Sequence, residues 1–267
     1  MRNWGIAVLM LAAACQQQKT QPPAKPPETT FDGAQVTDAA AKVAHGERLS
    51  WTLGCRGCHG PQLQGHSFYE RYASNLTREL PKYSDAEIER LLRTGVPRDG
   101  RVLYGMPSEI FQHVSAADMT ALIAELRTLK PGGKPTQPPK PCTKEAKELM
   151  AKGEIKPATV FVAEAKGVYP ADVGPTRALG RYITSVTCAE CHGPELRGQE
   201  KFTPNLVVAG GYTREQFETL MTKGIAANGR KLKDPLMGEV ARERFTHFTP
   251  HERDELYAYL KARAEER

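Results

Sequence analysis

A long segment occurs twice in this chain of 267 residues. Two short segments with the pattern Cys-x-x-Cys-His, at residues 55–59 and 188–192, lie 133 residues apart, and the sequences after them agree in register. CHGPQLQG at residues 58–65 matches CHGPELRG at 191–198, and YSDAEIERLLRTGV at 83–96 matches YTREQFETLMTKGI at 212–225. Because the offset stays between 129 and 134, insertions are few. The chain therefore holds two copies of one folding unit.

Each copy has the pattern of helices joined by loops. Ser84 and Thr213 are expected N-cap residues, apolar residues follow them at helical spacing, and a glycine ends each of these helices. The last helix of each copy is expected to begin at Ser115 and at Thr249. Nothing alternates with period two for long enough to indicate a sheet. The predicted fold class is all-α, with two tandem domains.

The pattern Cys-x-x-Cys-His has a specific chemical meaning. Two thiols three positions apart on a turning helix can both form thioethers with the vinyl groups of one haem, and the adjacent histidine is delivered to the iron. Zinc sites also use Cys-x-x-Cys pairs, but here each pair carries its own histidine and lies in a different copy of the repeat, which argues against one zinc site built from both pairs. A thioredoxin-like motif would need strand–helix alternation, which is absent. We expect two covalently attached haem c groups, held by Cys55, Cys58, His59 and by Cys188, Cys191, His192.

The haem motif, the size of each copy and a methionine downstream together resemble class I cytochrome c. The resemblance covers roughly residues 41–130 and 174–267. The whole chain looks like a membrane-anchored dihaem cytochrome c, similar to the cytochrome subunits of periplasmic dehydrogenases and respiratory enzymes. The resemblance implies an electron-transfer protein rather than an enzyme, with redox-partner proteins such as a dehydrogenase, an oxidase or another cytochrome.

Met106 and Met237 are the expected sixth ligands of the two irons. They are the only methionines that correspond between the copies, and they lie 47 and 45 residues after the proximal histidines, as in the family pattern. Met106-Pro107 also resembles the family's Met-Pro. Met119 and Met221 lie at helical positions and are expected to be packing residues. A thioether opposite histidine favours ferrous iron and closes the iron to small ligands.

Histidines are the alternative sixth ligands. His113 and His247 also correspond between the copies, but each lies two residues before an expected N-cap, where a surface or capping role is expected. His45 has no counterpart in the second copy and is expected to be exposed, and His251 is expected to be solvated in the first turn of a helix.

A glycine precedes each haem motif, Gly46 in the first copy and Gly180 in the second. The family resemblance implies that this glycine lets the first helix cross the last at close range, opposite an aromatic residue. Tyr259 fits that role in the second copy. Glu125 stands there in the first copy, so a looser crossing is expected.

The first residues are expected to be an export signal. Arg2 supplies a positive charge, and residues 4–14 form an apolar run too short to span a bilayer. The run ends in Leu-Ala-Ala-Ala before Cys15, which resembles the lipobox of bacterial lipoproteins. We therefore expect a signal peptide at 1–14, a lipidated Cys15 with a Pro-rich tether at 15–40, and a periplasmic protein anchored to a bacterial membrane. Simple cleavage after Ala14 is the alternative.

The remaining features set the expected organisation and function. Prolines cluster again at 131–141, so the expected domains are 41–130 and 174–267, joined by a linker at 131–173. Cys142 in that linker is expected to be an inert residue, with a free reactive or intermolecular thiol as the alternative. The net charge of +6 is mild and no basic run is dense, so no nucleic-acid partner is expected.

No acid–base pair or nucleophile arrangement is recognisable in the sequence. The predicted function is electron transfer between redox partners. A dihaem peroxidase-like enzyme and a gas-binding haem sensor are the alternatives, and each would need one open iron.

Overall fold

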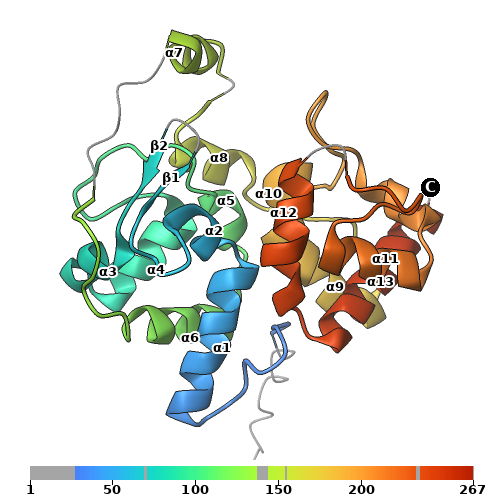
Figure 1. The fold of residues 1–267 in the computed structure, drawn as a ribbon, viewed down its shortest axis with the longest axis horizontal. Coiled ribbons are helices and arrows are strands. Elements are labelled where there is room, and N and C mark those ends of the chain that lie inside the picture. Colours follow the sequence, from blue (N-terminus) through green and yellow to red (C-terminus); the bar gives the residue numbers. More distant parts are fainter. Residues whose placement is uncertain (1–27, 69–70, 137–143, 154, 233–234, 267) are drawn as a thin grey trace, which may run out of the picture.

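The computed structural model describes residues 28–68, 71–136, 144–153, 155–232 and 235–266. Cys15, the expected signal peptide, most of the tether and Cys142 lie outside these residues. The two copies form two helical domains that lie side by side (Figure 1). The predicted all-α fold with two tandem domains is confirmed. No described helix is both long and apolar enough to cross a membrane.

Domain 1 comprises the first copy of the repeat. Its helical elements are α1 (Ala39–Thr52), α2 (Cys55–His59), α3 (Leu76–Glu79), η1 (Leu80–Lys82), α4 (Asp85–Thr94), α5 (Ser108–Phe111) and α6 (Ala116–Leu126). A short hairpin of β1 (His66–Phe68) and β2 (Arg71–Ala73) is the one sheet of the described residues, and it pairs Ser67 with Tyr72 in antiparallel register. Strands of three residues are too short to leave an alternating pattern in the sequence.

Domain 2 comprises the second copy. Its elements are η2 (Pro175–Arg177), α9 (Ala178–Ile183), η3 (Thr184–Cys188), α10 (Ala189–His192), η4 (Leu206–Gly211), α11 (Arg214–Lys223), α12 (Pro235–Glu243), η5 (Phe245–His247) and α13 (Pro250–Glu265). The π-helical segment η3 joins α9 to α10, whereas the equivalent helices α1 and α2 are separated by a turn that contains Gly54.

The helix boundaries follow from local chemistry. Ser84 and Thr213 each form a complete capping box with the residue three positions later, as Glu87 does with Ser84. Gly95 and Gly224 end these helices in the left-handed conformation, with φ of 69° and 66°. The same local signals therefore place α4 and α11 in the same position of each domain.

The first and last helices of each domain cross at contact distance. A Cβ on Gly46 would lie 2.0 Å from the carbonyl oxygen of Ala121, and one on Gly180 would lie 2.3 Å from that of Glu255. The looser crossing expected in domain 1 is therefore wrong. Glu125 is buried there because the guanidinium of Arg56 neutralises it at 2.6 Å, so a carboxylate can pack where domain 2 has an aromatic ring.

The segment between the two domains also contains helices, α7 (Lys144–Ala151) and α8 (Ala158–Glu164). Helix α8 packs against α4 and α5 of domain 1 (Figure 1). The backbone N–H of Ala158 donates to the carbonyl of Leu103 at 2.8 Å, and Tyr104 forms a bridge with Pro157. Helix α8 is thus attached to domain 1.

Candidate haem centres

A cavity of about 500 Å³ lies in domain 1, between α2 and the loop that precedes α5. Cys55, Cys58, His59 and Met106 all line it, so the fold brings together the four residues that the sequence singled out. The rest of its wall is mostly apolar: Leu53, Leu76, Leu80, Ile88, Leu92, Leu103, Phe111, Leu122 and Leu126. A cavity with this lining suits a large, flat and mainly apolar group.

The imidazole of each motif is oriented by a backbone carbonyl. Nδ1 of His59 donates to the oxygen of Ser74 at 2.8 Å, and Nδ1 of His192 donates to the oxygen of Pro204 at the same distance. Burial lowers the pKa of both imidazoles, which favours the neutral ring. A neutral ring that donates from Nδ1 keeps the lone pair of Nε2 for a metal. Both motifs therefore fit an iron ligand at this histidine.

The methionines differ in their position between the two domains. Met106 lies in the loop just before α5, whereas Met237 lies in the first turn of α12, and both are partly buried against the core. Met119 and Met221 are buried in the core at 1% and 3% exposure, as expected for packing residues. Met106 and Met237 remain the predicted axial ligands, because they are the methionines that correspond between the copies.

Three residues that line the cavity of domain 1 were not anticipated. Leu149 and Ile155 come from the segment between the domains, and Glu190 comes from the second haem motif, in domain 2. The position of Glu190 depends on how the domains dock, so no local sequence pattern could have indicated it. The apolar positions of α7 were the available signal for Leu149.

The first haem motif is fixed to its domain by Arg56, between its two cysteines. This buried guanidinium donates to the hydroxyl of Ser50, the carbonyl of Pro61 and the carboxylate of Glu125, each at 2.6 Å. It also lies over the ring of Trp51, 5.3 Å from its centroid. Because Glu125 is on α6, this residue ties the haem motif to the last helix.

The two domains meet through equivalent elements. Helix α5 of domain 1 contacts η3 and α10 of domain 2, and η5, the counterpart of α5, contacts α1. Each domain thus presents the same pair of surfaces to the other, as in an interface with two-fold symmetry. His113 and His247 lie in this interface, which corrects the expected surface or capping role. The ring of His247 stacks on Trp51 at 5.0 Å, and that of His113 lies 4.4 Å from Tyr169.

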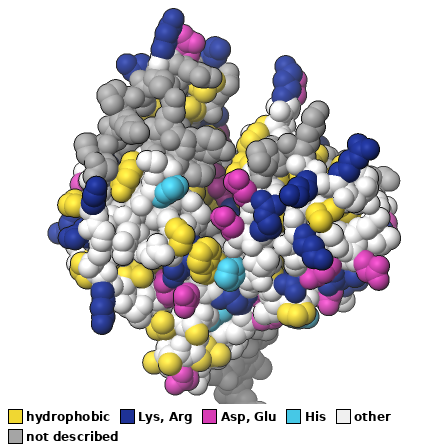
Figure 2. Space-filling view, in the orientation of Figure 1, with side chains coloured by type: hydrophobic (Ala, Val, Ile, Leu, Met, Phe, Trp, Pro, Cys, Tyr) yellow, Lys and Arg dark blue, Asp and Glu magenta, His cyan; other side chains and the backbone are white. Residues whose placement is uncertain are grey.

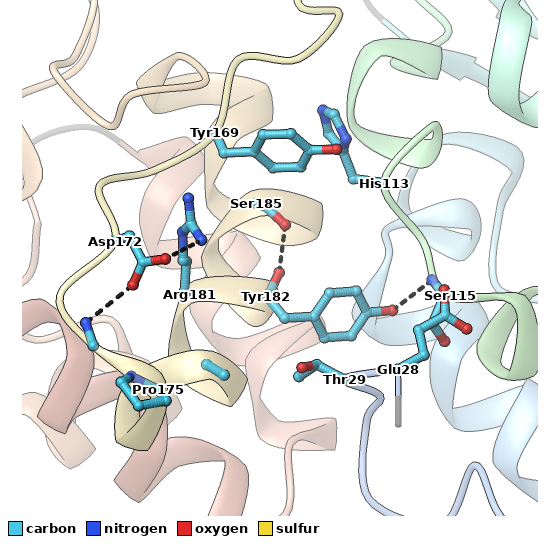
Figure 3. A pocket seen from close by; sticks show the side chains of 12 residues that line it. Glu28, Thr29, His113, Ser115, Tyr169, Asp172, Pro175, Arg181, Tyr182 and Ser185 are labelled. Carbon is cyan, nitrogen blue, oxygen red and sulfur yellow. Dashed lines mark hydrogen bonds and ion pairs between the residues drawn. The ribbon is translucent and has the colours of Figure 1, made fainter. Parts of the chain in front are cut away.

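Two buried carboxylates join the domains. Asp118 of domain 1 accepts a hydrogen bond from the hydroxyl of Tyr182 at 2.7 Å. The same hydroxyl accepts a hydrogen bond from the backbone N–H of Ser115 at 3.0 Å (Figure 3). Glu252 of domain 2 accepts two hydrogen bonds from Arg48 of domain 1, at 2.7 and 3.0 Å. These contacts connect helix α9 to α6, and α1 to α13.

His45 belongs to the same network. Its Nε2 lies 2.8 Å from Asp118, and the residue is only 6% exposed, so the prediction that it is exposed was wrong. The reason is the docking of the N-terminal segment, residues 28–38, over α1. A Cβ on Gly33 of this segment would lie 3.4 Å from the imidazole of His45.

A second cavity of about 370 Å³ lies beside this network, between the domains (Figure 3). Two of its charged lining residues, Asp172 and Arg181, pair with each other at 3.0 Å, and the Arg181 guanidinium lies over Tyr169. None of the four cysteines of the haem motifs lines it. It is therefore separate from the haem cavity.

Comparison with known proteins gives a consistent result. A family model described as Cytochrome c matches residues 43–130 and again residues 177–264. The chain is 25% identical to a "Diheme cytochrome c-type" protein of Cereibacter sphaeroides, over 92% of this chain and 85% of that protein. It is 27% identical to a nicotinate dehydrogenase subunit of Pseudomonas putida over 78% of this chain, but spans only 18% of that protein.

Proposed function

The chain belongs to the cytochrome c family, and we propose on that basis that it is a membrane-anchored periplasmic carrier that passes electrons between redox-partner proteins. Two covalently attached haem c groups, one in each domain, are supported by the repeated family domain and the dihaem relative. Bound haem iron supplies the chemistry by alternating between its ferric and ferrous states. The polypeptide contributes ligation, burial and orientation.

The proposed ligation follows the residues around the domain 1 cavity. Cys55 and Cys58 would anchor the haem, and His59, through Nε2, and Met106 would hold its iron. Cys188, Cys191, His192 and Met237 would do the same in domain 2. The observation that carries the proposal is that one apolar cavity gathers both cysteines, an oriented neutral histidine and the predicted methionine. Two irons closed by methionine suit outer-sphere electron transfer.

The proposed partners come from the same comparison. One relative is named as a dehydrogenase subunit, which supports a dehydrogenase as a candidate electron donor. Basic and acidic side chains both face solvent near the domain junction (Figure 2), and such charges steer redox partners during encounter.

A peroxide assay on the purified holoprotein tests this function against the peroxidase alternative. An electron carrier should take up and release electrons reversibly, with no catalytic peroxide reduction when reduced protein is mixed with hydrogen peroxide. Steady turnover of peroxide at the expense of an added electron donor would reject the carrier function and favour an open iron.

Fractionation of cells that express the full chain tests the anchor. The wild-type protein should sediment with membranes and incorporate a labelled fatty acid, and Cys15→Ser should move it to the soluble fraction without label. Cys142→Ser is the matched control, because it removes a cysteine outside the lipobox and should leave the protein on the membrane. A Cys15→Ser protein that still sediments and carries label would reject lipidation at this residue.

A further inference from the structure

Arg244 occupies an unusual place between the two domains. It lies just before η5 in domain 2 and is 8% exposed. Its Nε donates to the carbonyl of Thr52 in domain 1 at 3.2 Å, and its Nη1 donates to Glu190 at 2.9 Å. Its buried Nη2 has no hydrogen-bond partner among the described residues. A buried cation with an unsatisfied donor is costly, and such groups call for an explanation.

The guanidinium lies against both haem motifs. In domain 1 it packs on Gly54, the residue before Cys55, where an added Cβ would lie 2.7 Å from the Arg244 Cζ. In domain 2 its partner Glu190 is one of the two residues between Cys188 and Cys191. Glu190 in turn lines the domain 1 cavity. One ion pair therefore touches the attachment segment of each haem.

The electrostatic influence of Arg244 extends to both motifs. Its guanidinium packs on Gly54, next to Cys55, and pairs with Glu190, which lies between Cys188 and Cys191. Charges in a buried site are screened far less than charges in water. A buried charge in contact with the attachment segment of each domain will also act on the haems bound there.

The sign of that effect follows from charge balance. Reduction of ferric to ferrous iron adds one electron and lowers the charge of the haem by one unit. A fixed cation nearby therefore favours the reduced state and raises the reduction potential, and a fixed anion lowers it. Arg244 and Glu190 should act in opposite directions on the same pair of haems.

We propose that Arg244 and Glu190 form a shared electrostatic control of both haems, in which Arg244 raises the two reduction potentials and Glu190 limits that rise. Since the pair sits in the junction, a residue of domain 2 sets part of the potential of the haem in domain 1. This role rests on the proposed ligation of one haem by each motif.

Redox titration of the purified holoprotein, followed in the visible spectrum, tests the proposal. Arg244→Gln should lower both midpoint potentials, with the ferrous-to-ferric ratio at a fixed potential falling about tenfold, or 59 mV for a one-electron couple. Glu190→Gln should raise both potentials. Arg197→Gln is the matched control: it removes an equal charge near the second motif, but from a side chain that is 69% exposed, so its shifts should be much smaller.

The outcomes separate the possible failures. A shift of only one potential in Arg244→Gln would reject the shared control, and shifts of the same sign in Arg244→Gln and Glu190→Gln would indicate a packing effect only. If Arg244→Gln does not fold, Glu190→Gln still decides the sign, and Arg244→Lys, which keeps the charge, should leave both potentials near those of the wild type. A wild-type protein without two one-electron steps would instead contradict the haem assignment itself.

Discussion

Asp118 and Glu252 hold the same position in the two domains: each is the third residue of the last helix, and each is fully buried. Consecutive backbone N–H groups of the N-terminal segment donate to them, that of Phe31 to Asp118 at 3.0 Å and that of Asp32 to Glu252 at 2.9 Å. The ring of Phe31 packs edge-on against Tyr182 of domain 2. One short segment thus fastens both domains at equivalent points.

Removing one member of this network should lower the free energy of unfolding. Glu252→Ala leaves Arg48 without its buried partner, and such changes typically cost about 3–5 kcal/mol. Urea unfolding of the holoprotein should show this loss. The exposed pair of Glu195 with Arg197 offers the control, since Glu195→Gln should cost less than about 1 kcal/mol. Equal, small losses in both variants would show that Arg48 and Glu252 do not stabilise the junction.

The helix crossing in domain 1 makes a second prediction. Gly46→Ala would force a Cβ to within 2.0 Å of the carbonyl oxygen of Ala121, so α1 and α6 must separate at a cost of at least about 1–3 kcal/mol. Gly57→Ala is the matched control, because a Cβ there meets nothing within 4 Å. Thermal unfolding should show a clear fall in midpoint for Gly46→Ala only. A Gly46→Ala protein as stable as Gly57→Ala would contradict the close crossing.

The axial methionines can be tested one at a time. Met106→Ala and Met237→Ala should each remove about half of the far-red methionine–iron band and let the reduced protein bind one carbon monoxide per chain, because each opens one iron. Met119→Leu and Met221→Leu change buried core methionines and should leave the band intact. A full band in Met106→Ala or Met237→Ala would show that another residue ligates that iron.

The contact between the N-terminal segment and domain 2 should depend on pH. The hydrogen bond with Asp32 raises the pKa of His251, so its stabilisation is complete below the ordinary value of 6.5 and is lost as pH rises through the raised value. Burial alone would raise the pKa of Asp32, but hydrogen bonds from Thr249 and His251 and nearby positive charge lower it. The stabilisation from ionised Asp32 is present above its ordinary pKa of 3.8 and is lost only as the pH falls through its lowered pKa.

Comparison of the wild type with His251→Gln checks this dependence. The difference in unfolding free energy should be largest between these limits, near pH 5, and should shrink toward pH 8. Its size should stay below about 1 kcal/mol, because the His251 side chain is 62% exposed. A difference that grows with pH would reverse the sign and contradict the pairing with Asp32.

Features set by local chemistry were predictable from the sequence. The repeat indicated the two domains, and the N-cap residues Ser84 and Thr213 marked the start of α4 and α11. The haem motif, and its spacing to a methionine that occurs in both copies, identified Cys55, Cys58, His59 and Met106, which all line the domain 1 cavity. Each of these signals is a motif, a spacing or a repeat that can be recognised in the sequence itself.

Features that depend on the docking of distant segments were not predictable. In the sequence His45 has the pattern of a surface histidine, but in the fold Asp118 and the N-terminal segment cover it. In the sequence Glu190 is one of the two unspecified residues of a haem motif. In the fold the domain junction places it beside Arg244 and in the wall of the domain 1 cavity. A single sequence carries no local pattern for such contacts, because they depend on the relative placement of two folded units.

The most direct test of a closed dihaem carrier is the visible spectrum of the purified protein, oxidised and reduced, with haem counted per chain and carbon monoxide then added. We expect two haems per chain, a far-red methionine–iron band in the oxidised protein and no change when the gas is added to the reduced protein. One haem per chain, or a clear spectral shift with carbon monoxide, would contradict an electron carrier with two closed irons.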